Sequence, residues 1–408
     1  MRVLVLSHNL PRFRGDFSGT FVDALCRAMG AEGAQVEVVA PHDVAYDTSL
    51  PRPYSLHTYR YAWPASLQTV GYMRSLAGDL KPRRASLLVA PSMLLAGTLA
   101  CLRRVRLFRP DVIHAHWLLP NGLIGAVASR LTGIPLVVSM PGSDLLVARL
   151  NPLSRALARF TLRTASLVTA NSHELEGVAY TLGARQEHFD LVIYGVDPQA
   201  IRPDPEAGRA LRHERGIAPD EFLILAVGRM VPKKGFRYLV EAMPSVLAVS
   251  QRARLLFVGN GDERAALEST ARQLGVAERV DFAGVVPRHE ITAFYNAADV
   301  LVMPSVTEPE DGLNVCVLDA MACAKPIVAT MVAGNPLVVR DGVNGFLVPE
   351  RQAWPLAERL ARLAPSSELR RRLGSESRRL AEGEFAWPQI ARRYLDHFRR
   401  LASCGSLE

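Results

Sequence analysis

The stretch Phe222–Gly235, FLILAVGRMVPKKG, is the part of the sequence that decides the fold. Its unbroken apolar run, Phe222–Val227, is typical of a strand buried on both faces of a sheet. Gly228 ends the run, a basic loop follows, and Phe236–Val249 has the apolar spacing of a helix. A buried strand that leads through a glycine-containing loop into a helix predicts one unit of a parallel α/β sheet.

The same pattern recurs along the chain. Near the start, Arg2–Ser7 and Val36–Ala40 are predicted strands on either side of a predicted helix, Phe21–Met29. Further strands are expected at Val112–His116, Pro135–Ser139, Leu167–Ala170, Arg254–Val258, Val280–Ala283, Val300–Met303 and Pro326–Thr330. The pattern predicts two doubly wound, Rossmann-like α/β domains, residues 1–198 and 199–384, that face each other across a cleft.

Composition limits the class of protein. The 408 residues are 49% hydrophobic and 22% charged, which suits a globular chain of two domains. The five cysteines form no CxxC pair, so a disulfide framework or zinc ribbon is disfavoured and a cytoplasmic location is expected. No cleavable signal peptide is evident at the start. The formal net charge of +8 suits an anionic small molecule, an anionic membrane or nucleic acid.

One uncharged segment, Ala85–Leu102, raises the question of a membrane. Its length approaches the roughly 20 residues that span a bilayer. Pro91, Gly97 and flanking arginines at both ends favour a buried or interfacial helix over a transmembrane span. Peripheral contact with an anionic membrane and a helix packed on the sheet with solvated arginines both remain open. The arginine-rich tail, Trp354–Leu401, is predicted to be helical with solvated faces and not a nucleic-acid-binding element.

The loop after Phe222–Val227 carries the first candidate site residues. Arg229 and Lys234 place a guanidinium and an ammonium group at the end of a strand, where a phosphate would bind. An exposed basic turn is the alternative. No GxxxxGK[ST] or GxGxxG motif accompanies this loop, which disfavours a P-loop enzyme or a nicotinamide-dependent dehydrogenase.

A second candidate site begins where Glu308–Asp311 precedes a predicted helix. Asp311 lies near the amino end of that helix, where backbone N–H groups and the helix dipole attract anions, although simple helix capping is an alternative. Asp319 follows about two turns later and is expected near the same face. Within an apolar helix its carboxylate needs a partner.

Together these motifs have a family resemblance. Gly228-Arg229, Lys234-Gly235, Asp311-x7-Asp319 and Gly142-Ser-Asp144 occur in the same order as in the retaining family 4 glycosyltransferases of GT-B fold, also called glycosyl transferases group 1. The sequence resembles this family over essentially its whole length. The motifs are highly specific for the family and much less specific for its substrates. In this fold the helices at about residues 385–404 are expected to pack back on the first domain.

The resemblance implies roles for the candidate residues. Arg229 and Lys234 would grip the diphosphate of a nucleotide-sugar, Asp319 would bind the ribose, and Asp311 would contact the transferred sugar. Arg229, Lys234 and Asp311 would therefore be the catalytic residues. Further donor contacts are expected from Gly19, Val286, Gly312, Leu313 and Asn314.

The sequence departs from the family pattern at several positions. Aspartates replace the usual glutamates at Asp311 and Asp319, which shortens each side chain by one C–C bond, about 1.5 Å. Pro141 stands before Gly142, where the family often has a histidine that reaches the donor sugar. His116 and Asp144 are the candidates for the acceptor or sugar side.

His114 and His116 alternate on a predicted strand and so face one side. A metal pair is one interpretation, and ligand contact or packing is the other. No third ligand is evident, and the family works without a metal, so neither a metal nor a cofactor is expected.

The expected function is retaining transfer of a hexosyl or hexosaminyl group from a nucleotide-diphosphate sugar to a hydroxyl acceptor. That acceptor would be a glycan, a lipid-linked molecule or a small molecule, as in cell-envelope polysaccharide or glycolipid biosynthesis. A cytoplasmic location, peripheral at the inner face of the membrane, and no nucleic-acid partner are expected. The alternatives are a phosphorylase or a nucleotide-sugar epimerase of the same fold, and a catalytically idle binding or scaffold protein.

Overall fold

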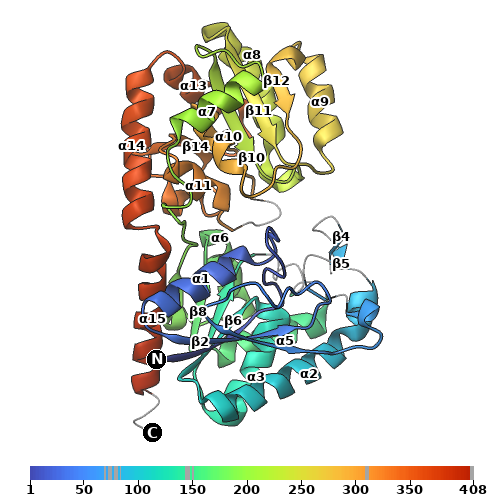
Figure 1. The fold of residues 1–408 in the computed structure, drawn as a ribbon. Helices are drawn as coiled ribbons and strands as arrows, with labels where there is room; N and C mark the ends of the chain where they lie inside the picture. Colours follow the sequence, from blue (N-terminus) through green and yellow to red (C-terminus); the bar gives the residue numbers. More distant parts are fainter. Residues whose placement is uncertain are drawn as a thin grey trace. The chain divides into compact units, whose positions relative to one another are not determined.

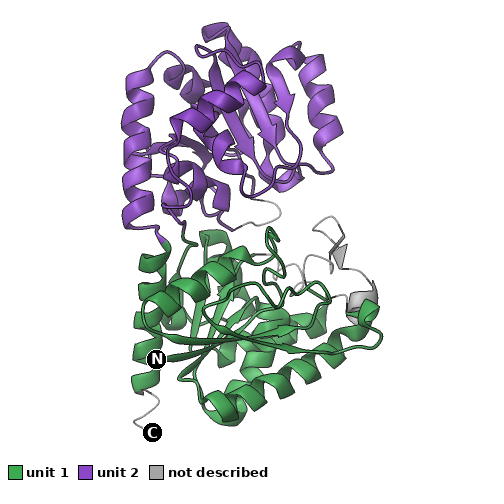
Figure 2. Ribbon diagram, viewed as in Figure 1, with its two compact units in different colours: residues 1–195, 387–408 green, residues 196–386 purple. Residues whose placement is uncertain are grey.

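A computed structural model describes residues 1–68, 70–71, 76–77, 81–82, 84–142, 148, 151–307 and 312–404. The chain divides into two compact units (Figure 2). Unit 1 comprises residues 1–195 and 387–408, and unit 2 comprises residues 196–386. The chain therefore passes out of unit 1 after Gly195 and returns to it at Trp387.

Unit 1 is built on a seven-stranded sheet in which every neighbouring pair is parallel. In spatial order the strands are β3 (Ser55–Tyr59), β2 (Gln35–Pro41), β1 (Arg2–Leu6), β6 (Val112–His116), β7 (Leu136–Met140), β8 (Leu167–Ala170) and β9 (Phe189–Leu191). The order reverses direction between β1 and β6, which is the switch point of a doubly wound fold. Two short antiparallel strands, β4 (Leu76–Ala77) and β5 (Lys81–Pro82), form a separate pair.

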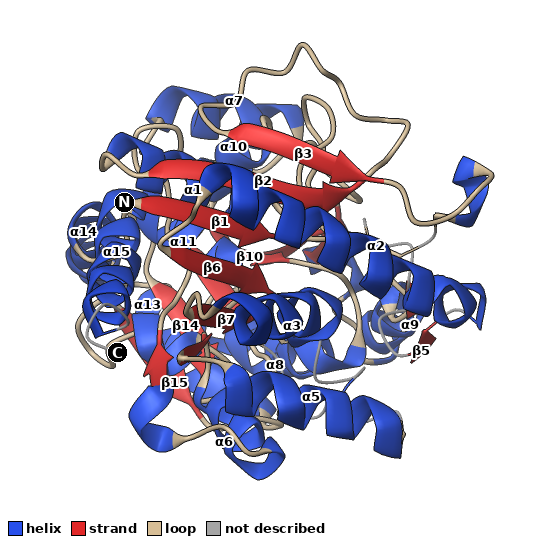
Figure 3. Cartoon of the chain, turned by 90° about the horizontal axis from the view of Figure 1, so that it is seen from below, coloured by secondary structure: helices blue, strands red, loops and turns tan. Residues whose placement is uncertain are grey.

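Helices cover both faces of this sheet, and Figures 1 and 3 show them beside the strands. Leu4 and Leu6 of β1 belong to a buried cluster with residues from one group of helices: α2 (Arg84–Phe108), α3 (Leu123–Thr132), α5 (Pro152–Thr164) and α6 (His173–Leu182). The alternate residues Val3 and Val5 are also fully buried, so the opposite face is covered too. Two helices pack against each other there, α1 (Thr20–Ala31) and α15 (Trp387–Cys404).

Helix α15 belongs to unit 1 although it follows unit 2 in the sequence. Its buried positions Ala391, Tyr394, Leu395 and Phe398 have the i, i+3, i+4, i+7 spacing of one helix face. This face supplies aromatic and aliphatic core to a sheet whose strands all precede residue 195.

Helix α2 contains the uncharged segment discussed above. It packs on the sheet through Met93 and Cys101, which are fully buried, while Leu95 and Leu99 are exposed. Within the described residues, Leu88–Phe108 is long and apolar enough to cross a membrane by length and composition, and 22% of its most apolar window is buried. Helix α2 thus packs on unit 1 through one face and exposes leucine side chains on the other.

Unit 2 repeats the architecture with a six-stranded parallel sheet. Its strands, in spatial order, are β12 (Val280–Phe282), β11 (Ala253–Val258), β10 (Phe222–Val227), β13 (Val300–Met303), β14 (Ile327–Thr330) and β15 (Gly345–Val348). One core joins the sheet to α8 (Phe236–Val249), α9 (Arg264–Gln273) and α13 (Ala353–Leu363). The remaining helices are α7 (Pro205–Glu214), α10 (Ile291–Ala297), α11 (Val315–Ala322), α12 (Asn335–Val338) and α14 (Ser367–Gly383).

The predicted fold class is confirmed: both units are doubly wound parallel α/β domains. Each predicted strand lies within a residue or two of an observed one. Five of the described strands were not predicted: β3, β9 and β15, which lie at the edges of the two large sheets, and the short pair β4 and β5.

Candidate functional site

The loops that follow β10, β11 and β12 come together at one edge of the unit 2 sheet. Gly228 and Gly259 follow β10 and β11, and a side chain at Gly259 would overlap the Gly228 carbonyl oxygen. The Gly259 N–H donates to the carbonyl oxygen of Gly284, which follows β12, at 2.8 Å. Because all strands are parallel, these contacts gather the loops at the carboxyl ends, the edge where such sheets bind ligands.

Lys234 is held firmly at this edge. It ends a short 3-10 turn, Pro232–Lys234, and it is buried. Its Nζ donates to Oδ1 of Asn314, and Asn314 Nδ2 in turn donates to Oγ of Ser305 at 3.1 Å. The ammonium group is therefore fixed beside the residue that precedes helix α11.

Gly235 fixes the loop that carries Lys234. It adopts φ 62°, in the left-handed region, and a Cβ there would overlap the carbonyl oxygen of Pro304. Beside this close approach, the N–H of Val306 donates to the carbonyl oxygen of Lys233 at 3.0 Å. The lysine loop and the segment after β13 are thus in backbone contact, which only glycine at position 235 permits.

Arg229 lies on the same loop with its side chain exposed. The backbone beside it is well anchored: the Met230 N–H donates to the Asn260 carbonyl oxygen at 3.0 Å, and the Val231 N–H donates to that of Arg229 at 2.9 Å. The loop therefore offers one exposed guanidinium and one buried ammonium group at a single strand end.

The start of α11 completes this group of residues. Gly312, Leu313 and Asn314 are buried immediately before the helix. The Asn314 side chain does not cap the helix, because it is engaged with Lys234 and Ser305. Free N–H groups and the positive end of a helix dipole favour an anion at this point. Asp311 lies outside the described residues, and Val286 is half-buried in the loop after β12.

Asp319 lies in the second turn of α11 and is 1% exposed. Arg288 grips it with two hydrogen bonds, Nη1 to Oδ2 at 2.5 Å and Nη2 to Oδ1 at 3.1 Å. The Tyr295 hydroxyl is 3.5 Å from Oδ2. Burial raises the pKa of Asp319, against the opposing effect of the Arg288 charge. The partner that a buried carboxylate needs is therefore supplied by the protein.

The remaining candidates lie in unit 1. Gly19 precedes helix α1 at φ 63°, and a side chain there would overlap the Asn9 carbonyl oxygen. His116 ends β6 and is buried, and its ring centroid is 4.3 Å from that of His114. The two rings therefore do face one side, as the alternation predicts. Asp144 lies outside the described residues.

A buried polar network surrounds these histidines. Nε2 of His114 is 2.8 Å from the Ser139 hydroxyl, which is 2.7 Å from that of Thr169 and 3.0 Å from that of Tyr394. The Tyr394 hydroxyl is also 3.1 Å from that of Thr169. This network joins three strands to α15, so His114 has a structural partner.

Burial keeps this part of unit 1 uncharged. It lowers the pKa of His8 and of His116 to about 3 and that of His114 well below its ordinary value. Nε2 of His116 and Oδ1 of Asn171 are buried without a hydrogen-bond partner in the described part of the chain. Both residues line a cavity of about 20 Å³, room for about one water molecule. Within the described residues, no group of three or more His, Cys, Asp or Glu side chains has the arrangement of a metal site.

The structure thus brings most of the predicted donor residues to one edge of the unit 2 sheet and places Gly19 and His116 in unit 1. Sequence reasoning missed Arg288 and Ser305. A signal for Arg288 existed, because a basic residue two positions after Val286 is a natural partner for a buried acid. The role of Ser305 depends on the side chain of Asn314, which donates to its hydroxyl.

Comparisons with known proteins agree with this architecture. The family described as "Glycosyl transferases group 1" matches residues 209–380, and "Glycosyl transferase 4-like domain" matches residues 18–195. Together they span most of the chain. The fold is that of the GT-B glycosyltransferases.

Relatives of assigned activity are also similar. The D-inositol 3-phosphate glycosyltransferase of Frankia alni is 32% identical over 77% of this chain and 80% of its own length. The 2-deoxystreptamine glucosyltransferase of Streptomyces kanamyceticus is 31% identical over 66% and 72%, respectively. Among solved structures, Anabaena HepE in complex with UDP has a TM-score of 0.75 at 20% identity, covering 98% of this chain and 100% of that one. The chain belongs to the glycosyl transferases group 1 family and is a glycosyltransferase.

Proposed function

We propose that this glycosyltransferase moves a hexosyl or hexosaminyl group from a nucleotide-diphosphate sugar to a hydroxyl acceptor with retention of configuration. The observation that carries the proposal is the anchoring of Lys234 by Asn314 beside the start of α11, with Arg229 on the same loop. Two cations and a helix amino terminus are suited to the negative charge of a departing diphosphate. The solved structures of HepE with UDP and with UDP-glucose support a donor of this class.

In this proposal each residue has a defined role. Arg229 gives planar contacts to the diphosphate, Lys234 a point charge, and the amides of Gly312, Leu313 and Asn314 face sugar and phosphate. Asp311 contacts the sugar, and Gly19 and Val286 contribute to donor binding. No metal or other cofactor takes part.

Asp319 is proposed as the ribose ligand. In that role its carboxylate must accept from a ribose hydroxyl while it also accepts from Arg288. A carboxylate that accepts from a guanidinium retains acceptor capacity for a ribose hydroxyl, because each carboxylate has about four lone-pair sites. Arg288 would then orient Asp319 for the ribose.

The acceptor is proposed to bind to unit 1 near His116 and Asp144. The relatives named above act on polar molecules that carry hydroxyl groups, D-inositol 3-phosphate and 2-deoxystreptamine. We propose a hydroxyl-bearing acceptor of small-molecule, glycan or lipid-linked type, in cell-envelope polysaccharide or glycolipid synthesis. The exposed leucines of α2 support peripheral contact with the inner face of the membrane in the cytoplasm.

The test is turnover of Arg229→Ala and Lys234→Ala with a panel of nucleotide-diphosphate sugars. Loss of one such charge contact is expected to lower kcat by about 100-fold or more. Arg237→Ala is the matched control, because Arg237 is an exposed arginine near the start of α8 that pairs with Glu241. Near wild-type kcat in either site variant would contradict diphosphate binding there. NMR of the anomeric proton in the product tests retention, and an inverted product would overturn that part.

A further inference from the structure

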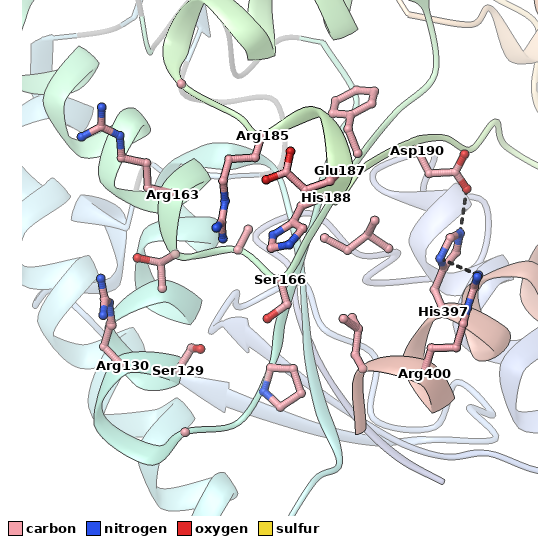
Figure 4. A pocket seen from close by; sticks show the side chains of 18 residues that line it. Ser129, Arg130, Arg163, Ser166, Arg185, Glu187, His188, Asp190, His397 and Arg400 are labelled. Atoms are coloured by element: carbon pink, nitrogen blue, oxygen red, sulfur yellow. Dashed lines mark hydrogen bonds and ion pairs between the residues drawn. The ribbon is translucent and has the colours of Figure 1, made fainter. Parts of the chain in front are cut away.

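A wide hollow in unit 1 lies at the amino ends of strands β7, β8 and β9 (Figure 4). Its volume is about 1580 Å³. It is lined by the ends of α3, α5 and α6, by the starts of those strands and by α15. His116 lies at the carboxyl end of β6, whereas the hollow lies at the amino ends of the neighbouring strands β7, β8 and β9.

Three arginines on the lining have no side-chain partner among the described residues. Arg130 comes from α3, Arg163 from α5, and Arg185 from the segment after α6. In the described part of the chain, none of the three guanidinium groups makes a hydrogen bond or ion pair. Figure 4 shows them on the same side of the hollow. Three separate elements therefore deliver unneutralised planar cations to one surface.

The carboxylates of the hollow do not balance this charge. Asp190 is engaged by Arg393 at 2.6 Å and by Nε2 of His397 at 2.7 Å. Glu187 is exposed, and Arg400 adds a further positive charge beside His397. The hollow therefore has an excess of positive charge.

Helix dipoles explain the positions of two of these three arginines. Arg130 and Arg163 lie in the last turns of α3 and α5, where the negative end of the helix dipole favours a cation. Arg185 lies beyond the end of α6 and has no such support within a helix. Deeper in the hollow, Oγ1 of Thr164 and Nδ1 of His188 are buried without a hydrogen-bond partner in the described residues. Helix dipoles do not account for these two atoms.

We propose that this hollow binds a ligand that carries two or more phosphate groups. Guanidinium forks match phosphate oxygens with paired hydrogen bonds, which lysines do not. Thr164 and His188 supply neutral groups that a phosphate oxygen or its ester can meet. The volume exceeds the 300–1,000 Å³ that is about usual for a drug-sized ligand, so an extended polyphosphate or several headgroups fit. The ligand is either a free phosphorylated molecule or the headgroups of anionic phospholipids.

The experiment is arginine footprinting of the full chain with phenylglyoxal, with modified peptides quantified by mass spectrometry. The probes are inorganic tripolyphosphate and phosphatidylglycerol vesicles, each compared with sodium chloride at equal ionic strength. At a probe concentration about ten times Kd, about one site in ten stays free, so modification of Arg130, Arg163 and Arg185 falls about tenfold. Arg155 is the internal control, because it lies exposed at the other end of α5 and does not line the hollow.

The two probes separate the sources of phosphate. Protection by tripolyphosphate alone indicates a free phosphorylated ligand, and protection by vesicles indicates phospholipid headgroups. Equal modification of the three arginines with both probes and with sodium chloride overturns the proposal. Protection of Arg229 is a separate readout that belongs to the proposed donor site.

A double variant confirms where the ligand binds. In Arg163→Gln/Arg185→Gln, tripolyphosphate should no longer protect Arg130, while protection of Arg229 should be unchanged. Arg155→Gln should leave the protection of Arg130 intact. Thermal unfolding verifies that each variant is folded, and protection of Arg130 that persists in the double variant contradicts the assignment.

Discussion

Asp319 has two partners to satisfy, one in the protein and one in the proposed ligand. Its bidentate contact with Arg288 neutralises a carboxylate that is otherwise enclosed by α10 and α11. Removing one partner of a buried pair costs more than the pair itself contributes, because a charge is left without compensation. This asymmetry allows the structural and ligand-binding roles of Asp319 to be separated.

Arg288→Met is expected to destabilise unit 2 by about 3 kcal/mol at neutral pH. Burial already raises the pKa of Asp319, and loss of the guanidinium raises it further. The folded state of the variant therefore holds a proton to higher pH than the unfolded state, so its stability falls as pH rises. Urea unfolding at several pH values measures this loss.

Asp319→Asn provides the control. It removes the charge and keeps a similar shape, so unfolding of Arg288→Met/Asp319→Asn should be closer to wild type than that of Arg288→Met alone. Donor affinity should still be weakened, because the proposed ribose contact is changed. Equal stability of Arg288→Met and wild type would show that the ion pair has no structural role.

Local sequence patterns predicted Asp319 but not its partner. An acid in an apolar helix is visible in the sequence, and so is its need for compensation. Its actual partner, Arg288, lies in the loop between β12 and α10, and only the packing of α10 against α11 brings the two residues together. The anchoring of Lys234 by Asn314 has the same origin, since it joins loops that are far apart in the sequence.

At the scale of elements, one backbone contact determines how the lysine loop meets the segment after β13. Gly235 and Gly216 adopt nearly the same left-handed conformation, with φ 62° and 63°. They differ in surroundings: a Cβ at Gly216 has nothing within 4 Å, whereas one at Gly235 meets the Pro304 carbonyl oxygen.

Gly216→Ala and Gly235→Ala should therefore differ in stability. In Gly216→Ala only the left-handed backbone conformation lowers the stability, by about 1 kcal/mol. In Gly235→Ala the same cost applies, and the loop must also move away from Pro304. We therefore expect the free energy of unfolding to fall by at least about 2 kcal/mol and donor binding to weaken. Thermal unfolding and donor titration of both variants measure the difference. Equal losses of stability in the two variants would mean that the lysine loop can move away from Pro304 without cost.

Interior strands were predictable, whereas three of the four edge strands of the two large sheets, β3, β9 and β15, were not. An interior parallel strand is covered on both faces and so appears as an apolar run, as in Phe222–Val227. β3 and β9 are half-exposed and lack such a run, and β15 begins at a glycine. The arginine-rich tail reads as helix throughout, and the structure divides it between α13 and α14 of unit 2 and α15 of unit 1.

At the scale of the whole molecule, the two units should respond differently to acid. In the described residues, the buried histidines His8, His114 and His116 all lie in unit 1. Burial lowers the pKa of each, so between about pH 6.5 and pH 3 the unfolded chain binds protons that the folded unit does not. The free energy of unfolding of unit 1 should therefore fall on acidification, by about 1.4 kcal/mol per pH unit for each histidine. Asp319 acts in the opposite sense in unit 2, because its pKa is raised.

Urea unfolding of Trp354→Phe measures unit 1 alone, because the remaining tryptophans, Trp63, Trp117 and Trp387, all belong to that unit. His116→Gln in this background should flatten the pH slope by about 1.4 kcal/mol per pH unit. An unaltered slope in His116→Gln would contradict the neutral state of the buried ring.

The return of the chain to unit 1 at Trp387 has a consequence for synthesis on the ribosome. All strands of the unit 1 sheet are translated first, but the face that receives Tyr394 and Phe398 stays open until unit 2 has been made. Domains generally fold as they emerge, amino-terminal first. Here the second domain to be translated is the first whose chain is complete, and the nascent first domain must keep an apolar groove out of contact with other proteins for the whole interval.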